Sequence, residues 1–97
     1  MLPISSAERP KLSPRARLAQ DKVTGKPIVL YPEGVLILNP TGHAIVTLCT
    51  GQETLEEIVT KLALQYRVSP EAMRADVIGY LNRLRALNLL ELSSKKS

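Results

Sequence analysis

The side chains that most often carry acid–base, nucleophilic or metal chemistry are scarce in this 97-residue chain. The single histidine, His43, lies in the segment LNPTGHAI, and no second histidine, carboxylate cluster or cysteine pair stands at metal-ligand spacing from it. The single cysteine, Cys49, lies near the expected end of the helix that this segment starts, where the helix dipole disfavours a thiolate. We therefore interpret His43 as a helix-surface residue, Cys49 as a small buried side chain, and Gly42 as a point of close packing.

Phosphate-binding and general acid–base patterns are missing as well. Neither G-x-G-x-x-G nor G-x-x-x-x-G-K-[ST] occurs, so the glycines are interpreted as turn and helix-boundary residues. Glu56 and Glu57 fit the first turn of a helix, where carboxylates stabilise the helix dipole, better than an acid–base pair. The sequence thus predicts no catalytic residue, no metal ligand and no cofactor site, and a small enzyme is the least favoured functional class.

The first half of the chain predicts a three-stranded antiparallel sheet. Three prolines and three serines in residues 1–15 indicate a flexible basic N-terminal arm. Strands are expected at 16–21, at 27–31 and at 35–38, with Gly25 turning the first hairpin. The last strand, VLIL, is apolar on both faces, so it needs cover on both sides or a partner on its edge.

The second half predicts three helices, each opened by a recognisable N-terminal signal. Asn39 followed by proline starts a helix to about residue 49, and Thr54 begins a capping box for a helix to about residue 66. Ser69 followed by proline opens the longest helix, to about residue 87, which Asn88 can end in the left-handed conformation. The following LLEL forms a last short strand or simply packs.

Together these elements predict an α+β, winged-helix-like domain, with the three-stranded sheet ahead of a three-helix bundle. Its expected bounds are 16–92, between the arm at 1–15 and a disordered tail at 93–97. One cysteine cannot form an internal disulfide, and no apolar run reaches the roughly 20 residues that span a bilayer. We therefore expect a cytoplasmic protein without a membrane partner.

Charge argues against nucleic acid as the main ligand. The formal net charge is +4, but residues 18–92 carry seven basic and eight acidic side chains. The rival function is a winged-helix DNA-binding protein that reads DNA with its third helix. Residues 71–88 hold three arginines against two acids, which is weak for phosphate contacts. The sequence favours a ligand other than nucleic acid.

A stripe of small residues on the third helix offers a binding surface. Gly79 costs about 0.5–1 kcal/mol relative to alanine in a helix interior, so a close approach by another backbone is a reason for it. An extended peptide could add to the edge of the strand at 35–38 while its side chains rest on this helix. Arg74 and Arg85 are available for an acidic peptide residue. The predicted peptide-binding residues are Val35, Leu36, Ile37, Leu38, Arg74, Ala75, Ile78, Gly79, Asn82 and Arg85.

The order and spacing of these signals resemble a known family. The segments RPKLSPRARL, VTGKPIVLYPEGVLILNPTGHA and DVIGYLNRLRALNLL are similar to those of PqqD, the peptide chaperone of pyrroloquinoline quinone (PQQ) biosynthesis. Thr50 and Asn88 depart from the family pattern, but both suit a helix end. The resemblance implies a non-catalytic domain that binds the precursor peptide PqqA in the strand–helix groove and presents it to the radical S-adenosylmethionine (SAM) enzyme PqqE. Whether it is a monomer or a strand-swapped dimer stays open.

Overall fold

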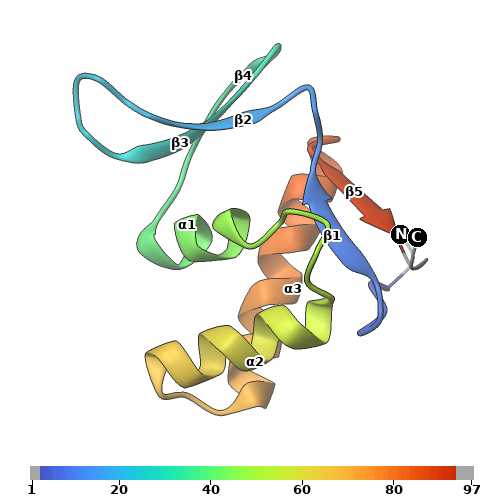
Figure 1. Cartoon of the computed structure of the whole chain (residues 1–97). Helices are drawn as coiled ribbons and strands as arrows, with labels where there is room; N and C mark the ends of the chain where they lie inside the picture. Colours follow the sequence, from blue (N-terminus) through green and yellow to red (C-terminus); the bar gives the residue numbers. More distant parts are fainter. Residues whose placement is uncertain (1–2, 94–97) are drawn as a thin grey trace.

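The α+β architecture expected from the sequence is confirmed. The computed structural model describes residues 3–93, and a three-stranded antiparallel sheet precedes the three helices (Figure 1). In chain order the elements are β1 (Arg9–Leu12), β2 (Arg17–Gln20), β3 (Pro27–Tyr31), β4 (Gly34–Ile37), α1 (Pro40–Thr47), α2 (Leu55–Tyr66), α3 (Pro70–Ala86) and β5 (Leu90–Ser93). Within the described residues, every helix is too short or too polar to cross a membrane.

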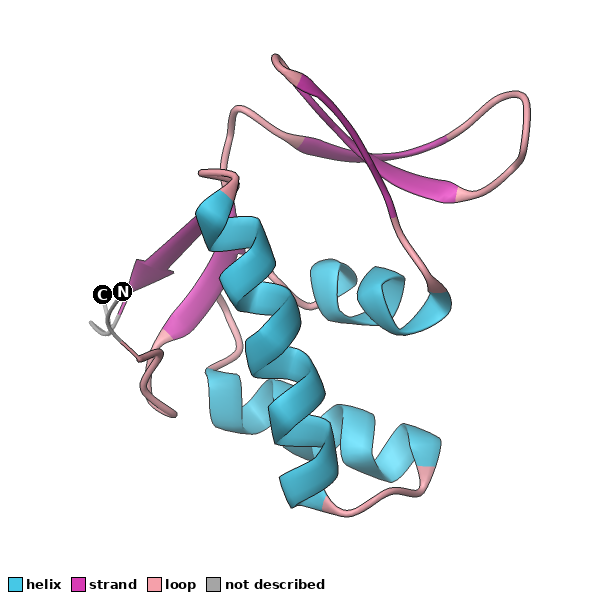
Figure 2. Cartoon of the chain, turned by 180° about the vertical axis from the view of Figure 1, so that it is seen from behind, coloured by secondary structure: helices cyan, strands magenta, loops and turns pink. Residues whose placement is uncertain are grey.

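Strands β2, β3 and β4 form a meander with β3 in the centre. Val29 of β3 lies opposite Leu18 of β2 and Leu36 of β4. Gly25 has φ +74° in the first hairpin, as its predicted role in the turn requires. Views from opposite sides show this sheet beyond α1, at the end of the molecule remote from α2, while α3 runs along the length between them (Figures 1 and 2).

All three predicted helix starts are present. The side chain of Asn39 accepts a hydrogen bond from the N–H of Gly42, and the hydroxyl of Ser69 accepts one from the N–H of Ala72. Thr54 and Glu57 form the complete capping box, each side chain accepting from the other's backbone N–H. Asn88 adopts φ +59° after α3, as predicted. These local signals therefore place the helices correctly.

The helices and the inner face of the sheet enclose one aliphatic core. Each of its fully buried side chains contributes about 1.5–3 kcal/mol through removal from water. Cys49 belongs to this core, and burial raises the pKa of its thiol to about 12. The expectation of a small buried side chain at Cys49 is confirmed. The largest fully buried aliphatic side chains are Ile45, Leu55, Ile58, Leu62, Leu81, Leu84 and Leu89.

The N-terminal segment differs from the expected arm. Residues 9–12 form β1, which pairs antiparallel with β5, and both Ile4 and Pro10 are buried. The N–H of Leu12 donates to the carbonyl of Cys49, and the N–H of Gly51 donates to that of Pro10. The expected flexible arm at 1–15 is thus wrong for residues 9–12, because the residues that stabilise this strand lie far away in sequence. Ser93 ends β5, and the rest of the expected tail, 94–97, lies outside the described residues.

Candidate functional site

Strand β4 is an edge strand: in the described part of the chain it pairs with β3 alone. Just after it, the N–H of Leu38 donates to the carbonyl of Pro27 at 3.0 Å. Hydrogen-bonded and non-bonded pairs alternate along an antiparallel ladder, so Ile37 and Val35 exchange no main-chain bonds with β3. Their N–H and C=O groups point away from β3, where a further strand could use them.

Successive side chains along β4 and Leu38 point alternately into the core and into solvent. Leu36 and Leu38 are 5% and 3% exposed and fix the strand to the core. Val35 and Ile37 are 53% and 63% exposed on the opposite face. Ile28 lies opposite Ile37 on β3 but is only 6% exposed, so Val35 and Ile37 form the exposed apolar face of this edge. The edge therefore combines unused main-chain groups with an apolar side-chain surface.

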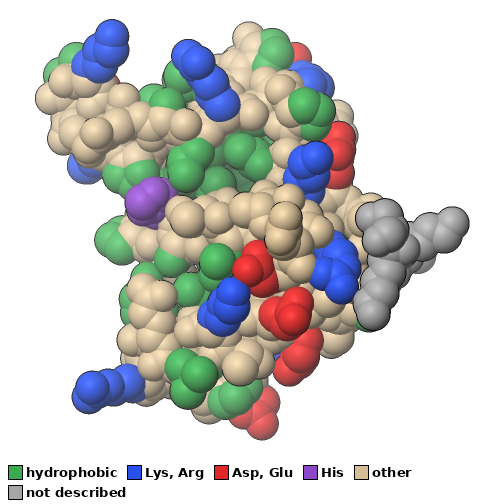
Figure 3. Space-filling model, viewed as in Figure 1, with side chains coloured by type: hydrophobic (Ala, Val, Ile, Leu, Met, Phe, Trp, Pro, Cys, Tyr) green, Lys and Arg blue, Asp and Glu red, His purple; other side chains and the backbone are tan. Residues whose placement is uncertain are grey.

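A groove of about 610 Å³ lies beside the end of β4, between that strand, the start of α1 and helix α3. Aliphatic and aromatic side chains form much of its wall, while Lys26, His43 and Arg83 supply polar groups. Figure 3 shows apolar side chains gathered in the hollow between the sheet and α1. The complete lining is Lys26, Pro27, Ile37, Leu38, Asn39, Pro40, His43, Tyr80 and Arg83.

The ring of Tyr80, on α3, packs against Gly42 in the first turn of α1. A Cβ atom added to Gly42 would lie 2.5 Å from both Cζ and Oη of Tyr80, so only glycine leaves room for the ring. The close packing predicted at Gly42 is thereby confirmed. Partial burial raises the pKa of the Tyr80 phenol, while the positive charge of Arg83 acts in the opposite direction. The ring is half-buried and forms a fixed wall of the groove.

The structure brings part of the predicted binding set together. Val35 and Ile37 lie on the free edge, Leu36 and Leu38 anchor the strand, and Ile37 and Leu38 line the groove. Tyr80 was not among the predicted binding residues, because its spacing from Val77 and Leu84 fits the face of α3 that is buried in the core. The signal that could have revealed it was Gly42, whose missing side chain implies a large neighbour.

The six predicted residues of α3 are not among the residues that line this groove. Arg74 pairs with Glu56 and also donates to the hydroxyl of Ser6, while Arg85 donates to the amide oxygen of Asn82. The two small residues, Ala75 and Gly79, are exposed, and Ile78 is half-buried. An added Cβ at Gly79 would meet nothing within 4 Å. The expected close approach of another backbone to Gly79 is therefore absent from the described chain.

Metal chemistry finds no support in the described residues, which contain no group of three or more His, Cys, Asp or Glu side chains suited to an ion. His43 is exposed on α1, as interpreted from the sequence, and it also lines the groove.

Comparison with known proteins places the chain in a family. The family model described as coenzyme PQQ synthesis protein D (PqqD) matches residues 28–90. The chain belongs to the PqqD family. The PqqA binding protein of Methylococcus capsulatus is 42% identical over 59 residues, which are 61% of this chain and 63% of that protein. The residues that the family model matches include β4, α1 and α3, and of the groove lining Lys26 and Pro27 lie just outside them.

Solved structures agree with membership in the PqqD family. The PqqD part of PqqCD from Methylobacterium extorquens, described as a stand-alone recognition element for ribosomally synthesised and post-translationally modified peptides, superposes with a TM-score of 0.77. It is 30% identical, and the match covers 91% of this chain and 94% of that one. TbiB1 in complex with the TbiA(beta) leader peptide matches at 0.71, with 25% identity and coverage of 84% and 94%. The PqqD fold described above is thus that of a peptide recognition element.

Proposed function

We propose that this member of the PqqD family is a peptide chaperone of PQQ biosynthesis, which binds the precursor peptide PqqA and presents it to the radical SAM enzyme PqqE. The observation that carries the proposal is the free edge of β4 beside an apolar groove. Support comes from the similar M. capsulatus protein, named a PqqA binding protein, and from TbiB1, whose solved structure contains a leader peptide.

Binding proceeds by strand addition. A segment of PqqA in extended conformation lies along β4 and exchanges main-chain hydrogen bonds with Val35 and Ile37. Each bond contributes about 0.5–1.5 kcal/mol net, so main-chain pairing alone gives modest affinity that depends little on sequence. Specificity then comes from the peptide's side chains, because successive side chains point to opposite faces of the extended sheet and meet different surfaces there.

One set of peptide side chains faces the groove and the other lies over the outer face of the meander. On the groove side, Leu38 and Tyr80 supply apolar contact. On the outer side, Val35 and Ile37 become cross-strand neighbours of the peptide's residues, and each apolar pair of this kind contributes about 0.2–1 kcal/mol. A peptide with apolar residues at adjacent positions, whose side chains point to opposite faces, therefore contacts both faces at once.

The chain itself performs no chemistry in this proposal. An extended peptide held along one strand keeps its other edge and its flanking residues accessible, and PqqE needs that access to act on bound PqqA. The proposed compartment is the cytoplasm, since the unpaired thiol of Cys49 suits reducing conditions. A second proposed contact surface for the peptide consists of the six predicted residues of α3, which are Arg74, Ala75, Ile78, Gly79, Asn82 and Arg85.

A titration of ¹⁵N-labelled protein with synthetic PqqA tests the binding step. We expect amide shifts concentrated in 35–38 and, on α3, at Tyr80 and Arg83. Amide shifts at Ala75, Gly79 and Asn82 instead would indicate that the peptide binds the second contact surface on α3. No shifts at saturating peptide would refute peptide capture by the isolated protein.

An N-methyl scan of PqqA tests strand addition itself. Methylation removes one backbone donor at a time, so strand pairing predicts weakened binding at every second position of the bound segment. A loss at every position, or at none, would refute the edge mechanism. Size-exclusion chromatography of the protein and PqqE, with and without PqqA, then tests presentation, for which a peptide-containing complex of all three is the expected result.

A further inference from the structure

Positive charge is concentrated around the apolar wall of the groove. Lys26 precedes β3, Arg83 lies on the last turns of α3, and both line the groove together with His43. No Asp or Glu is among the lining residues. This local excess is a property of the site, because residues 18–92 as a whole carry a net charge of −1.

These basic side chains are not neutralised by ion pairs in the described chain. The ion pairs found there join Arg15 to Glu33, Lys61 to Glu53, and Arg74 to Glu56, and none includes a groove residue. The carboxylate closest in sequence to Lys26 is Asp21, which accepts a hydrogen bond from the N–H of Val23 at 2.9 Å inside the hairpin loop. That bond lowers the pKa of Asp21, so the carboxylate serves the loop.

The position of the charges relative to the apolar wall constrains the ligand further. Pro27 follows Lys26 directly and its carbonyl accepts a hydrogen bond from the N–H of Leu38, and Tyr80 lies three residues before Arg83 on α3. Cations beside low-dielectric walls raise the local concentration of anions. A ligand that places an apolar side chain against Tyr80 and a carboxylate beside it would satisfy both parts of the site.

We propose that the groove selects an acidic peptide segment, in which an apolar residue and a neighbouring Asp or Glu are read together, with Lys26 and Arg83 as the specificity-determining residues. The inference rests on the proposed peptide capture and adds the charge class of the captured segment. It assigns the recognition of the carboxylate to Lys26 and Arg83 rather than to Arg74 and Arg85, whose guanidinium groups already have partners in the chain. His43 adds a polar group at the same rim.

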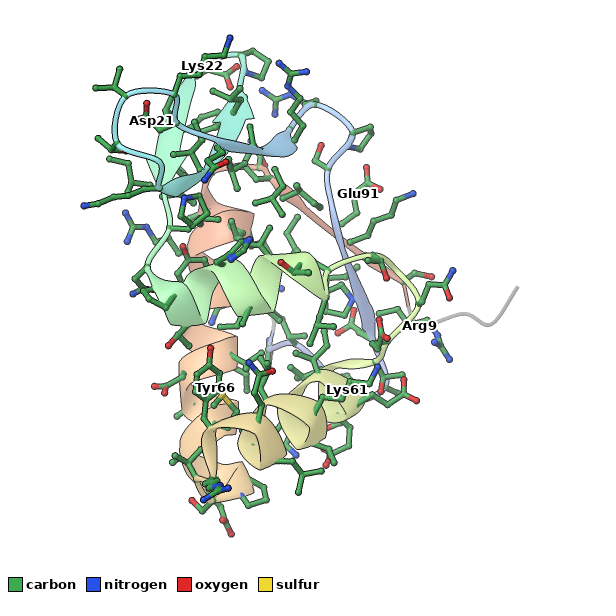
Figure 4. All side chains as sticks on the ribbon, turned by 60° about the vertical axis from the view of Figure 1, so that its left-hand side comes forward. Arg9, Asp21, Lys22, Lys61, Tyr66 and Glu91 are labelled. Carbon is green, nitrogen blue, oxygen red and sulfur yellow. The ribbon has the colours of Figure 1, made fainter. Side chains whose placement is uncertain are left out.

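The test compares two synthetic peptides: PqqA, and PqqA with every Asp and Glu replaced by its amide isostere. Both are titrated against the wild type, Lys26→Gln, Arg83→Gln and the double variant, at low and at high salt. The matched control is Lys22→Gln, which removes the same charge from the far end of the β2–β3 hairpin, away from the helices (Figure 4). Two-dimensional amide spectra establish that each variant is folded.

We expect the wild type to bind the acidic peptide more tightly than the amide peptide, with the difference shrinking at high salt. Each groove substitution should weaken binding of the acidic peptide by about 2- to 5-fold, the range of a solvent-accessible ion pair, and leave the amide peptide unchanged. Lys22→Gln should behave as the wild type. The double variant should bind both peptides alike.

Equal binding of the two peptides by the wild type would overturn this inference and leave peptide capture standing. Discrimination that persists in the double variant would overturn the assignment to Lys26 and Arg83. Failure of the wild type to bind either peptide would refute the proposed function itself, so the two failures are distinguishable.

Discussion

Replacing Gly42 with alanine should destabilise the fold, although alanine is the better helix former. The new Cβ would lie 2.5 Å from the Tyr80 ring. Carbon atoms pack at roughly 3.5–4.0 Å, so the ring or α1 must move by about 1 Å or more. Such overpacking costs about 1–3 kcal/mol, against a gain of about 0.5–1 kcal/mol for removing a helical glycine. We expect a net loss of about 1–2 kcal/mol in the free energy of unfolding.

Gly79→Ala is the matched control, because it makes the same change inside a helix where an added Cβ meets nothing within 4 Å. It should stabilise the protein by about 0.5–1 kcal/mol. Urea unfolding followed by circular dichroism measures both variants. A double-mutant cycle with Tyr80→Leu should show coupling of more than about 0.5 kcal/mol to Gly42→Ala and none to Gly79→Ala. A Gly42→Ala protein as stable as Gly79→Ala would refute the packing argument.

Three further predictions concern the N-terminal segment, the core and a helix cap. Ile4→Ala should lower the free energy of unfolding by about 2 kcal/mol because Ile4 is buried, whereas an N-terminal arm without packing contacts would give no change in urea unfolding. Cys49 should resist iodoacetamide at pH 8 in the native state and react in urea, since its pKa is about 12; rapid native labelling would contradict its burial. Thr54→Ala should cost about 1 kcal/mol at pH 7, because it removes the hydroxyl that accepts from the N–H of Glu57; the Thr54 backbone N–H lowers the pKa of Glu57 in both proteins, so both should lose the stabilisation from that carboxylate below about pH 4.5, and a urea midpoint unchanged by the substitution at pH 7 would count against the cap.

Local chemistry explains which parts of the fold were predictable. Asn39, Thr54 and Ser69 each cap the helix that follows them, so the signal and the structure lie within a few residues of each other. The β2–β3–β4 meander was predictable for the same reason, because short turns join its strands. The β1–β5 ladder was missed because residues 9–12 gain their order from residues 90–93, and no local pattern reports a partner so distant.

The candidate site was predictable in part, and the limit lies in the rotation of one helix. The edge strand follows from the VLIL run, which is apolar at four consecutive positions and still lacks a strand on one side. Which face of α3 meets the groove depends on how α1 packs, and that packing is fixed by the contact between Gly42 and Tyr80. Spacing within α3 alone therefore favoured the small-residue stripe, whereas Tyr80 and Arg83 line the groove.

The β1–β5 ladder also determines how this domain can be joined to other proteins. Its register sets Arg9 opposite Ser93, so the main chain enters and leaves the fold at one place, on the side away from the β2–β3 hairpin (Figure 1). A tether attached at either end would therefore start far from the groove and leave it open to ligand. The same geometry makes the domain a candidate for circular permutation, with a linker that starts ahead of residue 3, so that the buried Ile4 is kept, and with new ends cut at Val23 in the exposed hairpin loop.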